Sequence, residues 1–324
     1  RACFGSDFDG AWSEALAENE RRTMELASAL REALAALERA ACPCAVIEGG
    51  STVFSAGLPL AAFGAGDFDI LVGRADWERV KNVMRDLGYE GSERDGRVNT
   101  TRIQFKKISR RQINWLEIGY CAFDRTWVPL SYRDPVAAWL ERRTGGLDPD
   151  IPVLAPTDAL AVAVLHASLH SYVLSPALRL QVDIDRAARH PGVDWDAFVE
   201  TILEMGVQTR AFVSLMIAAA LLSTPVPGRV LSALAPEPAR WSALASLLGA
   251  QSVLAKRRSK LRGLRRFELD YLLHEAGPTA WVRSLVLPEP QWLLSHFGPR
   301  PVWRAHLKRY ALAAVSVADR LRRR

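Results

Sequence analysis

Two aspartates, Asp67 and Asp69, stand one residue apart at the start of an apolar run in the segment GAGDFDILV, residues 64–72. In an extended strand, residues i and i+2 project from the same face, so both carboxylates point together while Phe68 and Ile70 point to the other side. Two negative charges this close require a cation between them unless water solvates both. The pair therefore predicts either a cation-binding strand or the acidic rim of a solvated turn.

A glycine turn and a third acid accompany this pair. The turn Gly49-Gly50-Ser51-Thr52 follows the apolar segment CAVI, and Glu117 is the only acid in the later segment RQINWLEIGY. The glycines allow a tight turn, and Ser51 is expected to be the N-cap of a short helix. Backbone N–H groups at such a helix start bind anions. The sequence thus contains a candidate anion site as well as candidate cation ligands.

Alternating helices and strands are predicted around these residues. Apolar residues at helical spacing predict one long helix over residues 11–41, which ends before Pro43. The segments CAVIEGG and DFDILV are predicted strands, STVFSAGL between them is a predicted short helix, and ADWERVKNVMRDLG is a further helix that Gly88 ends. Two runs rich in β-branched and aromatic residues, NTTRIQFKKI and RQINWLEIGY, predict neighbouring strands.

The second part of the chain is predicted to be helical. After about residue 134 the strand signals fade, and helical runs follow over residues 135–143, 157–173, 176–189, 195–205 and 209–222. We therefore expect an α/β protein with a mixed β-sheet domain over residues 1–133, which includes the long N-terminal helix, and a mostly helical domain over residues 134–324.

The combination of a glycine-serine turn after one strand, Asp67-x-Asp69 on the next and Glu117 on a later strand resembles the nucleotidyltransferase (polymerase beta-like) superfamily. The resemblance implies a nucleotidyltransferase-like sheet. It implies that three carboxylates hold Mg²⁺ or Mn²⁺, namely Asp67, Asp69 and Glu117. It also implies that the phosphates of an NTP such as ATP bind at the turn formed by Gly49, Gly50 and Ser51.

The chemistry of group transfer from an NTP explains this pattern. Such transfer depends mainly on positioning and on neutralising the charge of the transferring group and the leaving pyrophosphate. Mg²⁺ prefers hard oxygen ligands and keeps several waters, so carboxylates and substrate phosphates complete its coordination. Two ions about 4 Å apart could stabilise both the attacking and the leaving oxygen. In this interpretation Glu117 also polarises the acceptor hydroxyl.

The helical half carries a second resemblance. LHASLHSYVLSPALRLQVDIDRAA is similar to a stretch of the uncharacterised nucleotidyltransferase family, whose members have a His-rich helix followed by Leu-Arg-x-x-x-Asp, and the matching residues here are His166, His170, Arg179 and Asp183. The segment FELDYLLHEAGPTAWVRSLVLPEPQWLLSHFG is also similar to that family, so the resemblance runs from about residue 12 onward. The histidines either line the nucleotide cleft or pack beneath the sheet. Arg179 either reaches a phosphate, with Asp183 holding it, or forms only an i,i+4 ion pair.

The sequence departs from the pattern of that family at two positions. Members often have Lys before the first glycine and Arg four residues before the first aspartate, and these positions are Glu48 and Phe63 here. Cations that could replace the two missing ones follow on the neighbouring strand: Arg102, Lys106 and Lys107. An alternative alignment of the third strand puts Asn114 in the place of Glu117.

Composition and charge restrict the classes of protein to be considered. The 324 residues carry a formal net charge of +6, which favours anionic partners such as nucleotides. The longest nearly apolar run, residues 211–222, is well short of the roughly 20 residues that span a bilayer. No secretory signal is visible, so we expect a cytoplasmic protein without a membrane partner. Four cysteines without metal-type spacing predict free thiols: Cys3, Cys42, Cys44 and Cys121.

A basic run without acids occupies residues 255–267, and four more arginines lie in the C-terminal tail, residues 320–324. The run is either a solvated helix face or a surface for RNA or another acidic substrate. It contains only one aromatic residue, at its end, which argues against stacking on bases.

These features predict a metal-dependent nucleotidyltransferase that moves a nucleotidyl group from an NTP to an acceptor hydroxyl. A small molecule, a peptide or protein, and RNA all remain open as the acceptor, with RNA the less favoured. Two alternatives remain open as well. The same site could transfer a terminal phosphoryl group as a kinase does, or the protein could bind a nucleotide without turnover.

Overall fold

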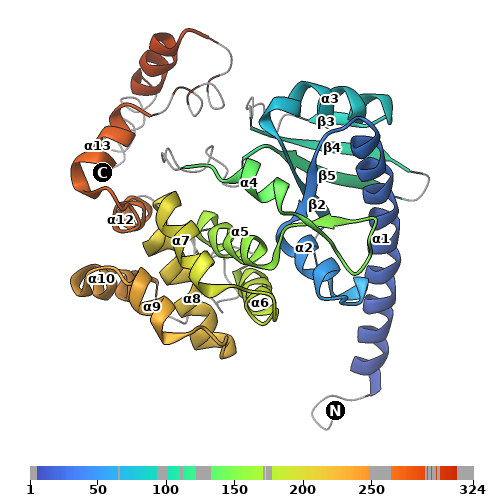
Figure 1. The fold of residues 1–324 in the computed structure, drawn as a ribbon, viewed down its shortest axis with the longest axis horizontal. Coiled ribbons are helices and arrows are strands. Elements are labelled where there is room, and N and C mark those ends of the chain that lie inside the picture. The colour runs from blue at the N-terminus through green and yellow to red at the C-terminus, as the bar shows by residue number, and fades with distance from the viewer. Residues whose placement is uncertain are drawn as a thin grey trace.

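A computed structural model describes residues 6–64, 66–92, 101–109, 112–121, 133–170, 172, 177–248, 264–288, 290, 293, 297 and 300–311. A seven-stranded mixed sheet organises the first part of this chain, and helices form the remainder (Figure 1). The strands are β1 (Cys44–Ile47), β2 (Asp67–Val72), β3 (Glu90–Ser92), β4 (Arg102–Ile108), β5 (Ile113–Gly119), β6 (Thr144–Gly145) and β7 (Pro152–Val153).

The strand order in the sheet is β3-β4-β5-β2-β1-β7-β6. Strand β2 lies at its centre, antiparallel to β1 and parallel to β5. The hairpin of β4 and β5 continues the sheet on one side, and β7 pairs in parallel with β1 on the other. Asp69 therefore belongs to two ladders, as the partner of Ile47 and of Glu117, while Asp67 pairs with β5.

One face of the sheet packs against two helices of the first part, α1 (Ser6–Arg39) and α3 (Trp77–Asp86). Helix α1 buries one apolar side, which includes Leu26, Leu30, Leu34 and Leu37. These residues recur every three or four positions, as one side of a helix requires. Figure 1 shows α1 running along the sheet and extending beyond it toward the N-terminus. Accordingly, Leu16 in its first half is exposed.

The other face of the sheet packs against the helices that follow, and Figure 1 shows α5 to α8 on the side opposite α1. The buried side chains Ala45, Ile47 and Leu71 belong to this second core. Its helices are α4 (Val136–Glu141), α5 (Pro156–Leu169), α6 (Ala177–Ala188), α7 (Trp195–Met205), α8 (Gln208–Leu222), α9 (Gly228–Leu234), α10 (Pro238–Leu248) and α12 (Leu264–Leu272). Helix α13 (Gly277–Val286) and a helical segment over residues 302–311 follow.

Short elements complete the connections between β1 and α3. Helix α2 (Glu48–Ser55) follows β1 directly, and it contacts both α5 and α6. The 3₁₀ turns η1 (Leu60–Ala62) and η2 (Arg74–Asp76) flank β2. Gly88 lies just after α3 with a backbone φ of 81°, and the sequence predicts the end of the helix at this glycine.

The structure confirms the mixed sheet and the many helices, and it differs from the sequence expectations in detail. Strand signals were expected to fade near residue 134, but the two-residue strands β6 and β7 still join the sheet. The prediction that Ser51 caps a helix is wrong, because α2 begins three residues earlier, with Ile47 at the N-cap position and no side-chain cap. The boundary between two domains at residue 133 stays a prediction.

The remaining predictions concern the cysteines, the basic segments and a possible membrane span. Cys42, Cys44 and Cys121 are free and buried as expected, and Cys3 lies outside the described residues. Most of the basic run and the whole arginine tail also lie outside them, since residues 251–263 and 312–324 are not described. Among the residues that are described, no helix has both the length and the apolar character needed to cross a bilayer.

Candidate active site

The register of the central strands brings the three predicted acids to one face of the sheet. Asp69 and Glu117 are Cα partners in the parallel pair of β2 and β5, and Asp67 pairs with Trp115. Phe68 and the other even-numbered residues of β2 are buried in the core beneath α1. Because side chains alternate along a strand, both aspartates and Glu117 point to the opposite face, where α5 and α6 lie.

Arg102, the first residue of β4, lies inside this group of acids. Its Nη1 donates to Glu117 Oε1 at 2.8 Å and to Glu48 Oε1 at 3.2 Å, and it contacts Asp69 Oδ1 at 3.4 Å. The Arg102 side chain is only 11% exposed. One guanidinium therefore compensates three nearly buried carboxylates, which we call the acid cluster: Glu48, Asp69 and Glu117.

The remaining aspartate of the pair has a neutral neighbour. Gln104, which is the Cα partner of Glu117 in the β4–β5 hairpin, donates from Nε2 to Asp67 Oδ2 at 3.3 Å. Asp67 thus lies at the edge of the acid cluster, beside a group that carries no charge.

Glu48 joins the acid cluster from the start of α2. Its backbone has a φ of 58°, a left-handed conformation that is uncommon for a residue with a side chain. Its carboxylate has two cationic or basic neighbours, because Oε2 lies 2.6 Å from His166 Nδ1 while Oε1 accepts from Arg102. Glu48 therefore links the sheet to α5 through these two contacts.

Burial and neighbouring charges shift the pKa values of Asp69 and Glu48 in opposite directions. Burial raises the pKa of Asp69 well above its ordinary value, and the carboxylates of Glu48 and Glu117 add to this effect more than Arg102 offsets it. Burial acts on Glu48 in the same direction, but the charges of His166 and Arg102 outweigh it, so the pKa of Glu48 is lowered. Asp69 therefore holds a proton more readily than an exposed aspartate does.

The glycines of the turn are required by close packing. A Cβ atom on Gly50 would lie 2.8 Å from Phe68 Cδ1 and 2.9 Å from Val46 Cγ1, so the backbone of α2 approaches β1 and β2 only without a side chain there. A Cβ atom on Gly49 would lie 3.2 Å from Asp183 Oδ2. The turn therefore lies between the sheet and α6.

Ser51 follows these glycines within α2. Its side chain is buried, and its Oγ makes no hydrogen bond within the described part of the chain. A buried hydroxyl without a partner is uncommon and calls for a physical reason.

The predicted residues of the helical part approach the same turn. His166 and His170 lie at the end of α5 with ring centroids 4.9 Å apart, and His166 is the one that reaches Glu48. On α6, Arg179 Nε is 3.9 Å from Asp183 Oδ2, too far for a hydrogen bond. A Cβ atom on Gly64 would be 3.8 Å from Arg179 Cδ, which places Arg179 beside the loop that leads into β2.

Burial raises the pKa of Asp183, and the charge of Arg179 opposes that shift. Asp183 lies close to both Gly49 and Arg179, so α6 presents a carboxyl group and a guanidinium together beside the glycine turn.

Phe63 and the three cations that could replace the missing ones lie in different surroundings. Phe63 is buried and stacks on Phe68 at 4.3 Å between ring centroids, so it belongs to the core. Lys107 Nζ binds Glu32 of α1, on the face away from the acids, and Lys106 Nζ binds Glu90 at 2.9 Å. Of the three cations expected on this strand, Arg102 is the one that contacts the acid cluster.

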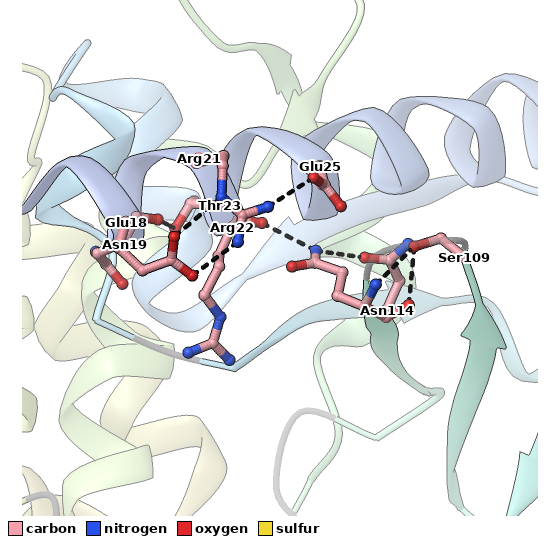
Figure 2. A network of polar contacts seen from close by, with 9 residues as sticks. Glu18, Asn19, Arg21, Arg22, Thr23, Glu25, Ser109 and Asn114 are labelled. Carbon is pink, nitrogen blue, oxygen red and sulfur yellow. Dashed lines mark hydrogen bonds and ion pairs between the residues drawn. The ribbon is translucent and has the colours of Figure 1, made fainter. Parts of the chain in front are cut away.

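Asn114, the alternative to Glu117, lies on the opposite face of the sheet. It accepts at Oδ1 from Gln112 Nε2 at 2.8 Å, and the same amide donates to the backbone oxygen of Arg22 in α1 at 3.1 Å. Figure 2 shows this network beside α1, with Ser109 at its end. Asn114 therefore helps to hold α1 to the hairpin, and the structure places Glu117 with the aspartates.

Sequence reasoning missed the part that Glu48 plays in the acid cluster and the contact between Gln104 and Asp67. A signal for Gln104 was present, because Arg102 and Gln104 alternate with apolar residues along a strand predicted to neighbour that of Glu117. As the side chains stand, no group of three or more His, Cys, Asp or Glu residues in the described ranges is arranged to hold a metal ion.

Comparison with known proteins supplies the family. A search of curated proteins finds none that matches this chain. The sequence model of a family described as uncharacterised nucleotidyltransferase matches residues 4–223, which contain every residue of the site described above. The chain therefore belongs to this family of uncharacterised nucleotidyltransferases.

Proposed function

We propose that this protein transfers a nucleotidyl group from an NTP to an acceptor hydroxyl, with Mg²⁺ or Mn²⁺ held by Asp67, Asp69 and Glu117. The observation that carries the proposal is the placement of these acids on one face of adjacent strands, next to the glycine turn of α2. Membership of a nucleotidyltransferase family supports the same class of reaction.

The donor set fits a hard divalent cation. The ligands offered are carboxylate oxygens, which Mg²⁺ and Mn²⁺ prefer. The acid cluster already holds one positive group, the Arg102 guanidinium, between Asp69 and Glu117. When bound, the metal would supply charge neutralisation for the transferring phosphoryl group and the leaving pyrophosphate.

The residues of the turn and of α6 suit the phosphates of the nucleotide. The backbone N–H groups at the start of α2 provide an anion site, and Ser51 Oγ is a donor without a partner in the described chain. Arg179, held loosely by Asp183, brings a planar guanidinium to the same region. In this proposal His170 lines the nucleotide site, and Glu117 polarises the acceptor hydroxyl.

The acceptor remains open among small molecules, peptides or proteins, and RNA. To identify it, the purified protein would be incubated with Mg²⁺ and an NTP that is labelled either at the α-phosphate or at the γ-phosphate. Fractions of each acceptor class would be added in turn, with Asp69→Asn as the control protein. Transfer of the α-label with release of pyrophosphate supports the proposal, whereas transfer of the γ-label identifies phosphoryl transfer.

A second candidate function is nucleotide binding without turnover. Two observations favour it, namely the position of Arg102 among the acids and the burial of Phe63 where relatives are expected to carry an arginine. Under this alternative, calorimetry would detect binding of an NTP analogue, and neither label would be transferred to any acceptor fraction.

A further inference from the structure

The guanidinium of Arg102 touches three elements of the fold at once. Through Nη1 it contacts Glu117 of β5, Asp69 of β2 and Glu48 of α2, at 2.8, 3.4 and 3.2 Å. The three carboxylates are each less than 20% exposed, so solvent screens them poorly. Arg102 is therefore the cation that makes this arrangement of acids possible in the absence of ligands.

Arg102 also competes with any other cation for the same oxygens. Asp69 Oδ1 and Glu117 Oε1 both face Nη1, and a divalent ion placed beside a guanidinium would be repelled by it. Asp69 and Glu117 can bind a metal ion fully only after the guanidinium has withdrawn from them.

Glu48 offers a position to which the guanidinium can withdraw. Its Oε2 is fixed by His166 Nδ1 at 2.6 Å, and its Oε1 already accepts from Arg102. It is the first residue of α2, immediately before Gly49, so a guanidinium held by Glu48 lies beside the anion site of the turn. The contact with Glu48 can persist when those with Asp69 and Glu117 are lost.

We propose that Arg102 is an exchangeable cation: it neutralises Asp69 and Glu117 while the site is empty, and it moves to the nucleotide phosphates, tethered by Glu48, when metal and NTP bind. This inference rests on the proposed function. It explains how a chain with Glu48 and Phe63 at two positions of expected cations still brings a positive charge to the phosphates. Arg102 then acts as a positioning residue that couples the binding of the metal to that of the nucleotide.

The proposal predicts opposite effects of one substitution on two ligands. Arg102→Met removes the competing charge and keeps much of the side-chain volume. Binding of Mn²⁺ alone should become at least about tenfold tighter, because a neighbouring positive charge is lost. Binding of a non-hydrolysable NTP analogue at saturating Mn²⁺, where the guanidinium has moved to the phosphates, should become at least about tenfold weaker, because the phosphates lose a charged hydrogen-bond donor.

The test measures Mn²⁺ binding by electron paramagnetic resonance and binding of the analogue by calorimetry, on the full chain. Lys106→Met is the matched control, because it removes one cation from the same strand and the same face, where it pairs only with Glu90 among the described acids. The control should change neither affinity by more than about twofold. Arg102→Gln, which keeps a hydrogen-bond donor, serves if circular dichroism shows that Arg102→Met is unfolded.

The outcomes distinguish this inference from the proposed function. If Arg102→Met binds Mn²⁺ no more tightly than the parent, while Asp69→Asn abolishes Mn²⁺ binding, the exchange is wrong and the metal site stands. If parent, Arg102→Met and Asp69→Asn all fail to bind Mn²⁺, the metal site itself is wrong, and the inference fails with it. Tighter Mn²⁺ binding together with weaker binding of the analogue supports both.

Discussion

Asp69 and Glu117 face each other as Cα partners in the parallel strands β2 and β5, and one guanidinium, that of Arg102, contacts both carboxylates. Parallel strands place equivalent positions side by side, so this relationship fixes two acids at the separation of neighbouring strands, roughly 4.8 Å. Such a pair on its own is unfavourable. At the centre of this sheet the Arg102 guanidinium supplies the positive charge that the pair requires.

Asp67→Asn and Asp69→Asn should each remove activity while leaving the protein folded. A lost metal ligand removes several kcal/mol of transition-state stabilisation, which corresponds to more than about a 100-fold fall in kcat/KM. Thermal unfolding in EDTA should show a midpoint for Asp69→Asn that is equal to or above that of the parent, because the substitution relieves repulsion within the acid cluster. Activity at the parental level in either variant would contradict the metal-site assignment.

Gly50→Ala should destabilise the protein by about 1–3 kcal/mol, as overpacking of a tight site does. The added methyl group would lie under 3 Å from both Phe68 and Val46, so α2 has to shift away from the sheet. Urea denaturation at equilibrium measures the free energy of unfolding.

The matched control for Gly50 is Gly10→Ala in the exposed part of α1, where a Cβ atom would meet nothing within 4 Å. Alanine favours a helix over glycine by up to about 1 kcal/mol, so this control should be neutral or stabilising. Equal effects of the two substitutions would show that packing at the turn is not the reason for Gly50.

Arg179→Lys should weaken binding of a non-hydrolysable NTP by about tenfold, because a point charge does not reproduce a planar fork of donors. Isothermal titration calorimetry gives the affinity. Arg189→Lys is the control, since Arg189, the residue after α6, forms a similar i,i+4 ion pair with Asp185, with Nε 3.0 Å from Oδ2. An unchanged affinity in Arg179→Lys would reduce its role to the helix ion pair with Asp183.

Arg142→Ala should destabilise the protein, because Asp158 is buried and accepts two hydrogen bonds of 2.7 Å from Arg142. Burial raises the pKa of Asp158 despite this pairing, so without Arg142 the folded state holds the proton of Asp158 to a higher pH still. A raised pKa in the folded state means that stability is lost as the pH rises through it. The loss should therefore be larger at pH 8 than near pH 4.5.

Arg142 is half exposed, so solvent limits the loss at pH 8 to about 1–3 kcal/mol. Denaturant midpoints at the two pH values measure it. In an Asp158→Asn background, Arg142→Ala should no longer show this pH dependence. If the dependence persists there, another group is responsible for it.

The sequence by itself determined the local features of the site. Alternation in DFDILV established that Asp67 and Asp69 share a face, and β2 has the bounds of this run, Asp67–Val72. Helical periodicity gave α7 at its observed bounds, Trp195–Met205. These predictions succeed because they depend on contacts within a few residues and on a strong division between apolar and polar sides.

Weaker local signals failed for physical reasons that can be named. Strands β6 and β7 have two residues each, too few for alternation to be visible. They exist because β1 offers a partner to β7, which in turn pairs with β6. Ser51 has the residue type of an N-cap, but the glycines before it allow α2 to begin at Glu48, which buries its hydroxyl.

Only the tertiary structure decided the partners of the charged side chains. Glu48 and His166 are 118 positions apart, and Arg102 reaches Asp69 only because β4, β5 and β2 pair in one particular register. Asn114 and Glu117 are alike in sequence context, yet a difference of three positions puts them on opposite faces of β5. Charge attraction acts between any two such groups, so the identity of each pair follows from the distances that the packed backbone imposes.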